Sequence, residues 1–252
     1  MYKRQNLILS EIHGGVCTVT LNNPSKKNAL SLALLTEFEN RLEQLQENEK
    51  LRALILKGTE DYFSVGADLA DISGTLADQE IDDRILRVCH LMQLLPIPCL
   101  VAVEGPCVGG AVSILLGCDI MVASENAYFE IPAIQLGLLY NPDSMKQLHA
   151  RFGSGILTRL FLLGERCSAH KLLQTGMAGE IVQDAKAYQK ALKLAQNFTG
   201  TGEAFTATKS LIIALEHGED NLSHWKNIRE KNLCSAERKA SISKVKKKLC
   251  ID

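Results

Sequence analysis

Short apolar runs alternate with amphipathic segments along the first half of the chain. Residues 16–21, 51–56 and 100–103 are apolar and bounded by turn residues, which predicts buried strands. Between the first two runs, leucine and phenylalanine recur at spacings of three and four over residues 31–49, which predicts an amphipathic helix with Ser31 as its N-cap. Strand, helix and strand in this order predict a right-handed parallel unit and therefore an α/β fold.

Beyond residue 131 the pattern becomes mainly helical. Two earlier helices are expected over residues 81–95 and 110–117, and a strand is expected over residues 128–131. The later helices are predicted over residues 144–152, 156–163, 168–174, 185–198 and 204–217, and from residue 222 onward. We therefore expect a core of residues 1–195 followed by a helical region, residues 196–252, within the same structural unit.

Size, charge and cysteine usage narrow the class of protein. A chain of 252 residues with 46% hydrophobic content can bury one large core. The formal net charge of −1 gives no basic excess, so neither nucleic acid nor a membrane is an expected partner. The eight cysteines form no Cys-x-x-Cys pair, which favours reduced, buried thiols over a metal site. With no apolar leader or membrane-spanning run in the sequence, we expect a cytoplasmic protein.

Two glycine-bearing stretches about forty residues apart carry the candidate chemistry. Phe-Ser-Val-Gly-Ala-Asp-Leu covers residues 63–69, and Glu-Gly-Pro-Cys-Val-Gly-Gly-Ala covers residues 104–111. Each follows an apolar run and therefore puts small residues at the mouth of the predicted sheet. Backbone N–H groups of Ala67 and Gly110 that converge from two strand ends would form an oxyanion hole for a carbonyl oxygen. A thioester or ester carbonyl is the leading candidate substrate.

These motifs, taken in order, resemble those of the enoyl-CoA hydratase/isomerase (crotonase) superfamily over nearly the whole chain. The similar segments are residues 22–24, 27–30, 63–69, 98–110, 118–120, 136–137, 163–169 and 176–178. The resemblance implies a crotonase (ClpP/crotonase-like) fold, with repeated ββα units forming a spiral core and a C-terminal helical trimerisation region. It also implies a homotrimer or dimer of trimers that binds an acyl-CoA or acyl-carrier-protein thioester. No cofactor is expected beyond coenzyme A as part of the substrate.

The chain departs from hydratases of this superfamily at both catalytic carboxylates. Those relatives carry one glutamate on the helix after the glycine pair and another directly after a proline, and the matching positions here are Ser113 and Ala133. Hydration requires a base to activate water and an acid to protonate carbon, and neither side chain serves at neutral pH. Ala70 likewise replaces a lysine that often follows this Gly-Ala-Asp-Leu motif in relatives, which argues against the lysine-dependent decarboxylases of the superfamily. An efficient hydratase is therefore not expected.

Other polar residues could replace the lost groups. The turn after Leu136-Gly137 offers Tyr140 as a hydrogen-bond donor and Asp143 as a general base or nucleophile. Asp143 could instead be the N-cap of a helix that begins near Ser144. His90 lies on a helix that passes the acyl pocket in relatives, and a histidine among apolar residues is more often a core side chain than a catalyst.

The resemblance also implies contacts to the thioester. Lys26 and Lys27 match the loop that contacts the nucleotide end of coenzyme A, and lysine suits a phosphate as a point charge. Substrate contacts are further expected at Ala29, Gly66, Asp68, Leu69 and Gly109, and at His90, Ser113 and Ala133. A cationic cluster near the C-terminus either contributes to a neighbouring subunit's CoA site or is a solvated helix end; it comprises Arg238, Lys239, Lys244, Lys246, Lys247 and Lys248.

These observations predict an enzyme that stabilises an enolate of an acyl thioester in the Ala67 and Gly110 oxyanion hole. Double-bond isomerisation, decarboxylation or another lyase step fits best, because such reactions tolerate the loss of both glutamates. Two alternatives stay open. The chain could be an enoyl-CoA hydratase with non-standard acid and base residues, or a catalytically silent family member that binds thioesters.

Overall fold

The computed structural model describes residues 6–59, 61–198 and 202–249. Two compact units divide the chain, one ending at Phe198 and the other beginning at Thr199. The boundary lies three residues after the one expected from the sequence. Within the described ranges, no helix is both long and apolar enough to cross a membrane.

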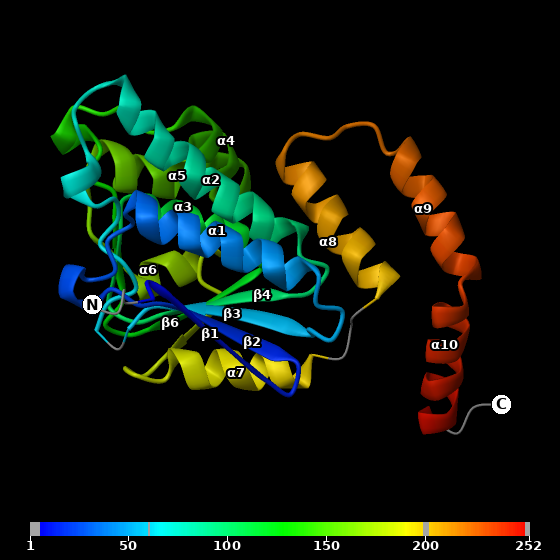
Figure 1. Ribbon diagram of the computed structural model, residues 1–252. Helices are drawn as coiled ribbons and strands as arrows, with labels where there is room; N and C mark the ends of the chain where they lie inside the picture. Colours follow the sequence, from blue (N-terminus) through cyan, green and yellow to red (C-terminus); the bar gives the residue numbers. More distant parts are fainter. Residues whose placement is uncertain (1–5, 60, 199–201, 250–252) are drawn as a thin grey trace. The chain divides into compact units, whose positions relative to one another are not determined.

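A six-stranded sheet forms the centre of the first unit (Figure 1). Its strands, in spatial order, are β1 (Ile8–His13), β2 (Val16–Leu21), β3 (Ala53–Lys57), β4 (Cys99–Val103), β6 (Ile120–Ser124) and β9 (Glu180–Val182). All neighbouring strands are parallel except β1, which pairs antiparallel with β2. The parallel strands are nearly continuous apolar runs because helices cover both faces of the sheet.

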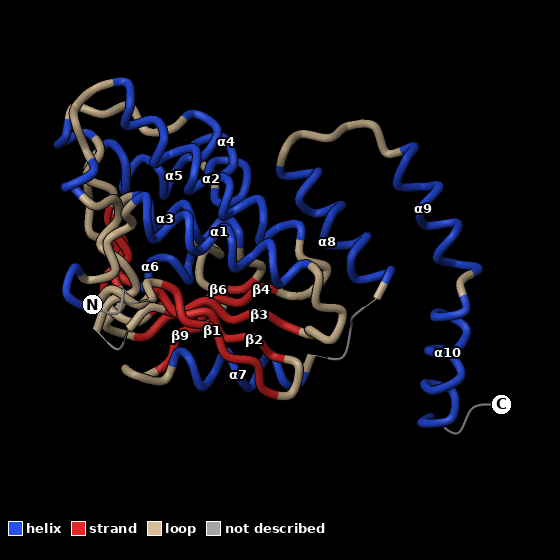
Figure 2. Tube along the Cα trace, in the orientation of Figure 1, coloured by secondary structure: helices blue, strands red, loops and turns tan. Residues whose placement is uncertain are grey.

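Alternate side chains of each strand serve the two faces. On one face, Ile55 and Leu100 pack with three alanines of α7 (Ala187–Asn197), spaced four residues apart. On the other face, Leu56 and Val101 join the larger cluster that includes α1 (Leu32–Gln46), α2 (Gln79–Leu94) and α3 (Gly110–Ile114). Figure 2 shows α7 on the opposite side of the strands from α1 and α3. The core therefore lies in two layers, and the loops at the strand ends are held between packed helices.

A second, three-stranded sheet lies beside the first, at the end of the unit that carries the two glycine motifs. It contains β5 (Pro106–Val108), β7 (Tyr128–Glu130) and β8 (Cys167–Ser168), with β5 parallel to β7 and β8 antiparallel to β7. The remaining helices of the unit are α4 (Pro142–Phe152), α5 (Ser154–Leu157) and α6 (Ala169–Gln174). The strand β5 carries the second glycine motif into α3, and thereby fixes where that short helix begins.

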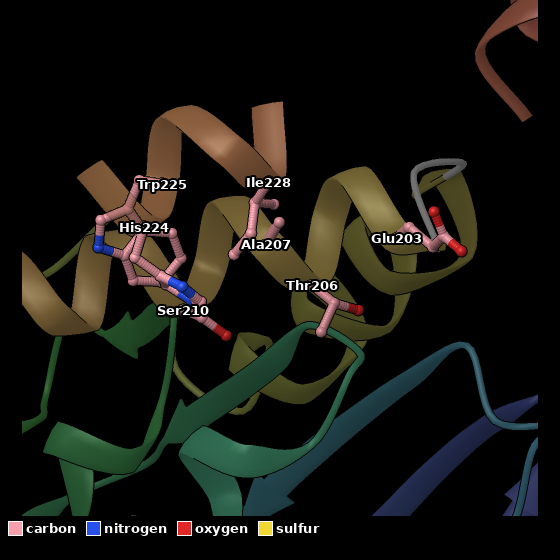
Figure 3. A pocket seen from close by; sticks show the side chains of 7 residues that line it. All are labelled: Glu203, Thr206, Ala207, Ser210, His224, Trp225 and Ile228. Carbon is pink, nitrogen blue, oxygen red and sulfur yellow. The ribbon is translucent and has the colours of Figure 1, made fainter. Parts of the chain in front are cut away.

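The second unit consists of α8 (Glu203–Glu216), α9 (Ser223–Cys234) and α10 (Ala236–Leu249). A pocket of about 470 Å³ lies between α8 and α9 (Figure 3). In that view His224 and Trp225 lie together near Ser210, whereas Glu203 lies at the far end. Lys209 is the sole buried residue among positions 202–249.

Most of the long elements agree with the sequence pattern. The strand over 16–21 and the first helix are confirmed, and Ser31 caps that helix by accepting a hydrogen bond from Leu34 N. The expected helix over 110–117 is α-helical to Ile114 and then continues as a 3₁₀ turn, and residues 158–162 form a π-helical turn. The cysteines at 17, 89, 99, 107, 118 and 167 are buried as expected, Cys234 is exposed, and Cys250 lies outside the described residues.

Candidate active site

The two glycine motifs pack directly against each other. Ser64 forms a parallel bridge with Cys107, and Val108 N donates to Ser64 O at 3.0 Å. Gly66 has a φ of +87°, and a Cβ atom built on it would lie 2.6 Å from Val108 O and 3.5 Å from Gly109 Cα. Only glycine fits this contact, since any side chain would separate the loops. The approach brings the residues that follow each glycine to one place.

The Ala67 amide is turned away from its neighbouring strand. Leu30 N donates to Gly66 O at 2.8 Å, and Asp68 N donates to Leu30 O at 3.1 Å. In this parallel bridge the hydrogen bonds of Leu30 flank Ala67, whose own N–H therefore points to the opposite side. Ala67 is partly exposed.

The Gly110 amide is the first N–H of α3. Gly109 precedes it with a φ of +58° and donates its own N–H to Glu130 O at 2.8 Å, which anchors the turn on β7. The first N–H groups of a helix have no partner within the helix. Among the described residues, neither Ala67 N nor Gly110 N donates a hydrogen bond to the protein. Two free amides from touching loops provide what a developing oxyanion requires.

Ser113 and Tyr140 form a buried hydrogen-bonded pair one turn into α3. The two hydroxyl oxygens lie 2.6 Å apart, and Tyr140 Oη can also donate to Gly109 O at 3.3 Å. Tyr140 packs edge-on against Phe161, and only 1% of Ser113 is exposed. Burial raises the pKa of Tyr140, with the hydrogen bond to Ser113 acting in the opposite direction. The phenol therefore stays protonated near neutral pH, and it can donate a hydrogen bond but cannot serve as a base.

Asn28 organises the first glycine loop, a role that the sequence reasoning missed. Its amide nitrogen lies within 3.2 Å of Tyr62 O and Phe63 O, and its amide oxygen accepts from Asn23 N at 2.9 Å. Ser64 Oγ donates to Asn28 O at 2.7 Å and accepts from Gly66 N. Asn28 adopts a φ of +57°, which asparagine tolerates better than most residues. From the sequence, Asn28 was noted only as part of the segment 27–30 that resembles the superfamily.

The two lysines expected at the CoA site have partners within the protein. Lys26 Nζ lies 2.6 Å from Asp68 Oδ2, and the hydrogen bond from Lys26 lowers the pKa of Asp68. Asp68 also accepts from Ala70 N, and thereby caps the turn that follows the first glycine loop. Lys27 Nζ lies 5.2 Å from the centre of the Tyr62 ring. Lys26 therefore joins two loops of the site, and its contact with a nucleotide stays a prediction.

Two alternatives drawn from the sequence are wrong. Asp143 does not cap α4, because the helix begins at Pro142 and the side chain of Asn141 accepts from Asp143 N and Ser144 N. Asp143 is exposed in the first turn of this helix. His90 is exposed on α2 and is therefore not a core side chain.

The remaining predicted contact residues differ in accessibility. Ala29 and Ala133 are buried, whereas 69% of Leu69 is exposed. Gly109 is partly exposed at the turn into α3.

Within the part of the chain that the structure describes, no three histidine, cysteine or acidic side chains are grouped to hold a metal ion.

Comparisons with known proteins find relatives over most of the chain. The family model for enoyl-CoA hydratase/isomerase matches residues 11–247. The chain is 29% identical over 180 residues to the 2,3-dehydroadipyl-CoA hydratase of Escherichia coli (strain K12). The aligned residues cover 71% of each protein.

Solved structures agree over almost the full length. An enoyl-CoA hydratase from Bacillus anthracis superposes with a TM-score of 0.86 at 27% identity, covering 97% of both chains. Pseudomonas aeruginosa DspI superposes with a TM-score of 0.87 at 25% identity, covering 98% of this chain and 96% of that one. The match of the family model to most of the chain, together with these superpositions, shows that the chain belongs to the enoyl-CoA hydratase/isomerase family and has the crotonase fold.

Proposed function

We propose that this enzyme stabilises the enolate of an acyl thioester and acts as an isomerase or a lyase, including decarboxylation, rather than as an efficient hydratase. The observation that carries the proposal is the pair of unbonded amides at Ala67 and Gly110, on loops that touch through Gly66 and Gly109. A thioester oxygen held by both N–H groups would gain negative charge at little cost when a proton or carboxylate leaves the α-carbon.

The neighbourhood of Ser113 argues against fast hydration. Where the resemblance implies a glutamate, Ser113 is hydrogen-bonded to the phenol of Tyr140, and Ala133 supplies no ionisable group at the second position. Addition of water needs a group that activates the water and another that protonates the α-carbon. A neutral Ser–Tyr pair with a raised tyrosine pKa cannot perform the first of these steps.

The proposal extends to the assembly. Six apolar side chains on two adjacent segments of the first unit are exposed: Ile134, Leu136, Leu138, Leu139, Leu162 and Leu163. The segments are neighbours because a Cβ on Gly164 would lie 3.1 Å from Gln135 Nε2. Such a patch supports the homotrimer or dimer of trimers that the resemblance implies. The exposed lysines of α10 are the groups that would reach a partner subunit's CoA site, with coenzyme A or an acyl carrier protein as the thioester carrier.

The proposal is tested by two rates measured on the same preparation. We expect vinylacetyl-CoA, a β,γ-unsaturated thioester, to be converted to the conjugated isomer. Hydration of crotonyl-CoA should be much slower than about 10 s⁻¹, a typical enzyme turnover. Crotonyl-CoA hydration at that rate or faster would overturn the proposal and favour a hydratase with non-standard acid and base groups.

The second candidate is a catalytically silent family member that binds thioesters. The exposed carboxylate of Asp143 favours it, because the turn expected to supply a replacement base leaves that carboxylate in solvent. A thermal-shift panel of acyl-CoAs and acyl carrier proteins separates the candidates. Binding with no isomerisation, decarboxylation or proton exchange would identify a thioester-binding protein without catalysis, whereas binding with any of these reactions supports the enzyme.

A further inference from the structure

The helices α2 and α3 run in the same direction along their contact. A Cβ on Gly110 would lie 2.6 Å from Ile85 Cδ1, and Cys89 Sγ donates to Ser113 O at 3.1 Å one turn further along both helices. The turn of α2 that precedes Ile85 therefore extends past the first residue of α3. Because helix N–H groups point toward the N-terminus, the Gly110 amide points into the space beside that turn.

Asp82 occupies this turn. It lies three residues before Ile85, and residues 82, 85 and 89 follow the three-and-four spacing of one helix face. Its side chain is half-buried, unlike that of its neighbour Asp83, which is exposed. Among the described residues, none forms a hydrogen bond or an ion pair with the Asp82 carboxylate. A half-buried carboxylate without a partner is uncommon in a structural role, since burial of a charge is costly.

The electrostatic surroundings of Asp82 fit a proton carrier. Burial raises its pKa, and the nearby carboxylates of Asp83 and Asp78 raise it further. Burial is the main cause of the raised pKa of Tyr140, and the charge of Asp82 raises it further. A carboxyl group with a raised pKa is a stronger base when ionised than an ordinary surface aspartate, and returns a proton more readily at neutral pH.

We propose that Asp82 is the catalytic acid–base residue that moves the substrate proton at this oxyanion site. The proposal rests on the proposed function, because it supplies the proton carrier that the loss of both glutamates leaves missing. Asp82 was not among the site residues expected from the sequence.

The step needs no co-reactant. The ionised carboxylate of Asp82 takes a proton from the α-carbon of a β,γ-unsaturated thioester, and the electron pair of the broken C–H bond enters a dienolate whose oxygen is held by Ala67 N and Gly110 N. Protonated Asp82 then gives its proton to the γ-carbon, which moves the double bond into conjugation and restores the carboxylate. One proton leaves and one returns, so the net reaction is an isomerisation.

The test compares three variants of the full-length protein with vinylacetyl-CoA as the probe. Asp82→Asn keeps the size of the side chain and removes the proton acceptor, so we expect the isomerisation rate to fall by about a hundredfold or more. The thermal shift given by vinylacetyl-CoA should persist in this variant. Asp83→Asn, on the exposed side of the same turn, leaves the Asp82 carboxylate in place and should lower the rate far less than Asp82→Asn does. Asp82→Glu retains a carboxylate and should recover part of the activity lost in Asp82→Asn.

The outcomes separate this inference from the proposal on which it rests. An active wild type whose rate is unchanged by Asp82→Asn overturns the assignment of Asp82, and leaves the enolate chemistry standing. In that case a hundredfold loss in Asp143→Asn would move the role to Asp143. A wild type that binds the thioester panel but neither isomerises any member nor exchanges its α-protons overturns both.

Discussion

The two compact units of the chain differ in how completely their side chains are buried. In the first unit, both faces of the sheet are covered and the largest side chains, such as Phe38, Phe63 and Phe129, are fully buried. In the second unit, α8, α9 and α10 leave almost every described side chain at least partly exposed, including Ile212, Leu215 and Val245. The first unit is therefore stabilised by its own core, whereas the second has too little burial to be stable alone.

This difference shows that the volume of a pocket does not indicate where the chemistry of this protein takes place. The pocket between α8 and α9 is lined by residues such as Trp225 and His224, but it lies on helices with little internal packing. The Ala67 and Gly110 amides, which we propose form the oxyanion hole, lie where two loops are fixed by buried hydrogen bonds through Asn28 and Ser64. Catalysis requires groups held in place before the substrate arrives, and only the first unit provides this.

The largest expected effect concerns the Gly110 amide. Proline suits the first position of a helix but has no N–H. Gly110→Pro should therefore lower the isomerisation rate by about 10²–10³ relative to Gly110→Ala. Alanine is the matched control because it keeps the amide, and its added Cβ meets the same Ile85 methyl group as the proline ring. Both variants are first checked for folding by circular dichroism. Equal rates in the two would show that chemistry does not depend on this amide.

A smaller effect is expected from the buried hydroxyl pair, measured by urea denaturation. Tyr140→Phe removes the partner of Ser113 Oγ and the bond to Gly109 O, and should lower the free energy of unfolding by about 1–3 kcal/mol. Combining it with Ser113→Ala should recover part of that loss, because no hydroxyl is then left buried without a partner. If the losses of unfolding free energy in the two single variants add in the double variant, the two hydroxyl groups are not coupled. Their hydrogen bond would then stabilise the first unit less than its geometry implies.

The smallest effect is a separation between two unfolding curves of the unchanged protein. The chain contains one tryptophan, Trp225, and it lies in the second unit. Its fluorescence should change at a lower urea concentration than the far-ultraviolet circular dichroism, which is dominated by the first unit, because segments with little burial open first. Coincident curves at all protein concentrations would mean that the two units unfold together, and the contrast between them would fail.

The sequence predicts the long, strongly patterned elements and misses the short ones. Ser31 and the apolar stripe after it are sufficient to place α1, because cap and periodicity agree. β9 has three residues and β8 has two, too few for any period to be visible. β1 has an exposed side and alternates imperfectly, so tertiary pairing with β2 rather than local pattern fixes it.

The candidate site is predictable where it depends on backbone and unpredictable where it depends on packing. Gly66 identifies the first loop because only glycine permits its approach to Val108, and Gly109 identifies the second because its φ of +58° favours glycine. Pro142 indicated a helix that begins there, which would have given the cap to Asn141 rather than Asp143. Asp82 could not be separated from Asp83 without knowing which face of α2 meets α3.

The order of strands in the main sheet has a consequence for synthesis of the chain. β6 pairs on one edge with β4, but its other edge stays open until β9 has been made, after all of α4, α5 and α6. A parallel strand edge without its neighbour is a site where chains can associate wrongly. We expect nascent chains that end before residue 180 to associate with one another or with chaperones, and chains that extend beyond β9 and α7 to lose that tendency. Ribosome-bound chains of graded length, compared by protease resistance, would show whether the sheet closes at this last strand.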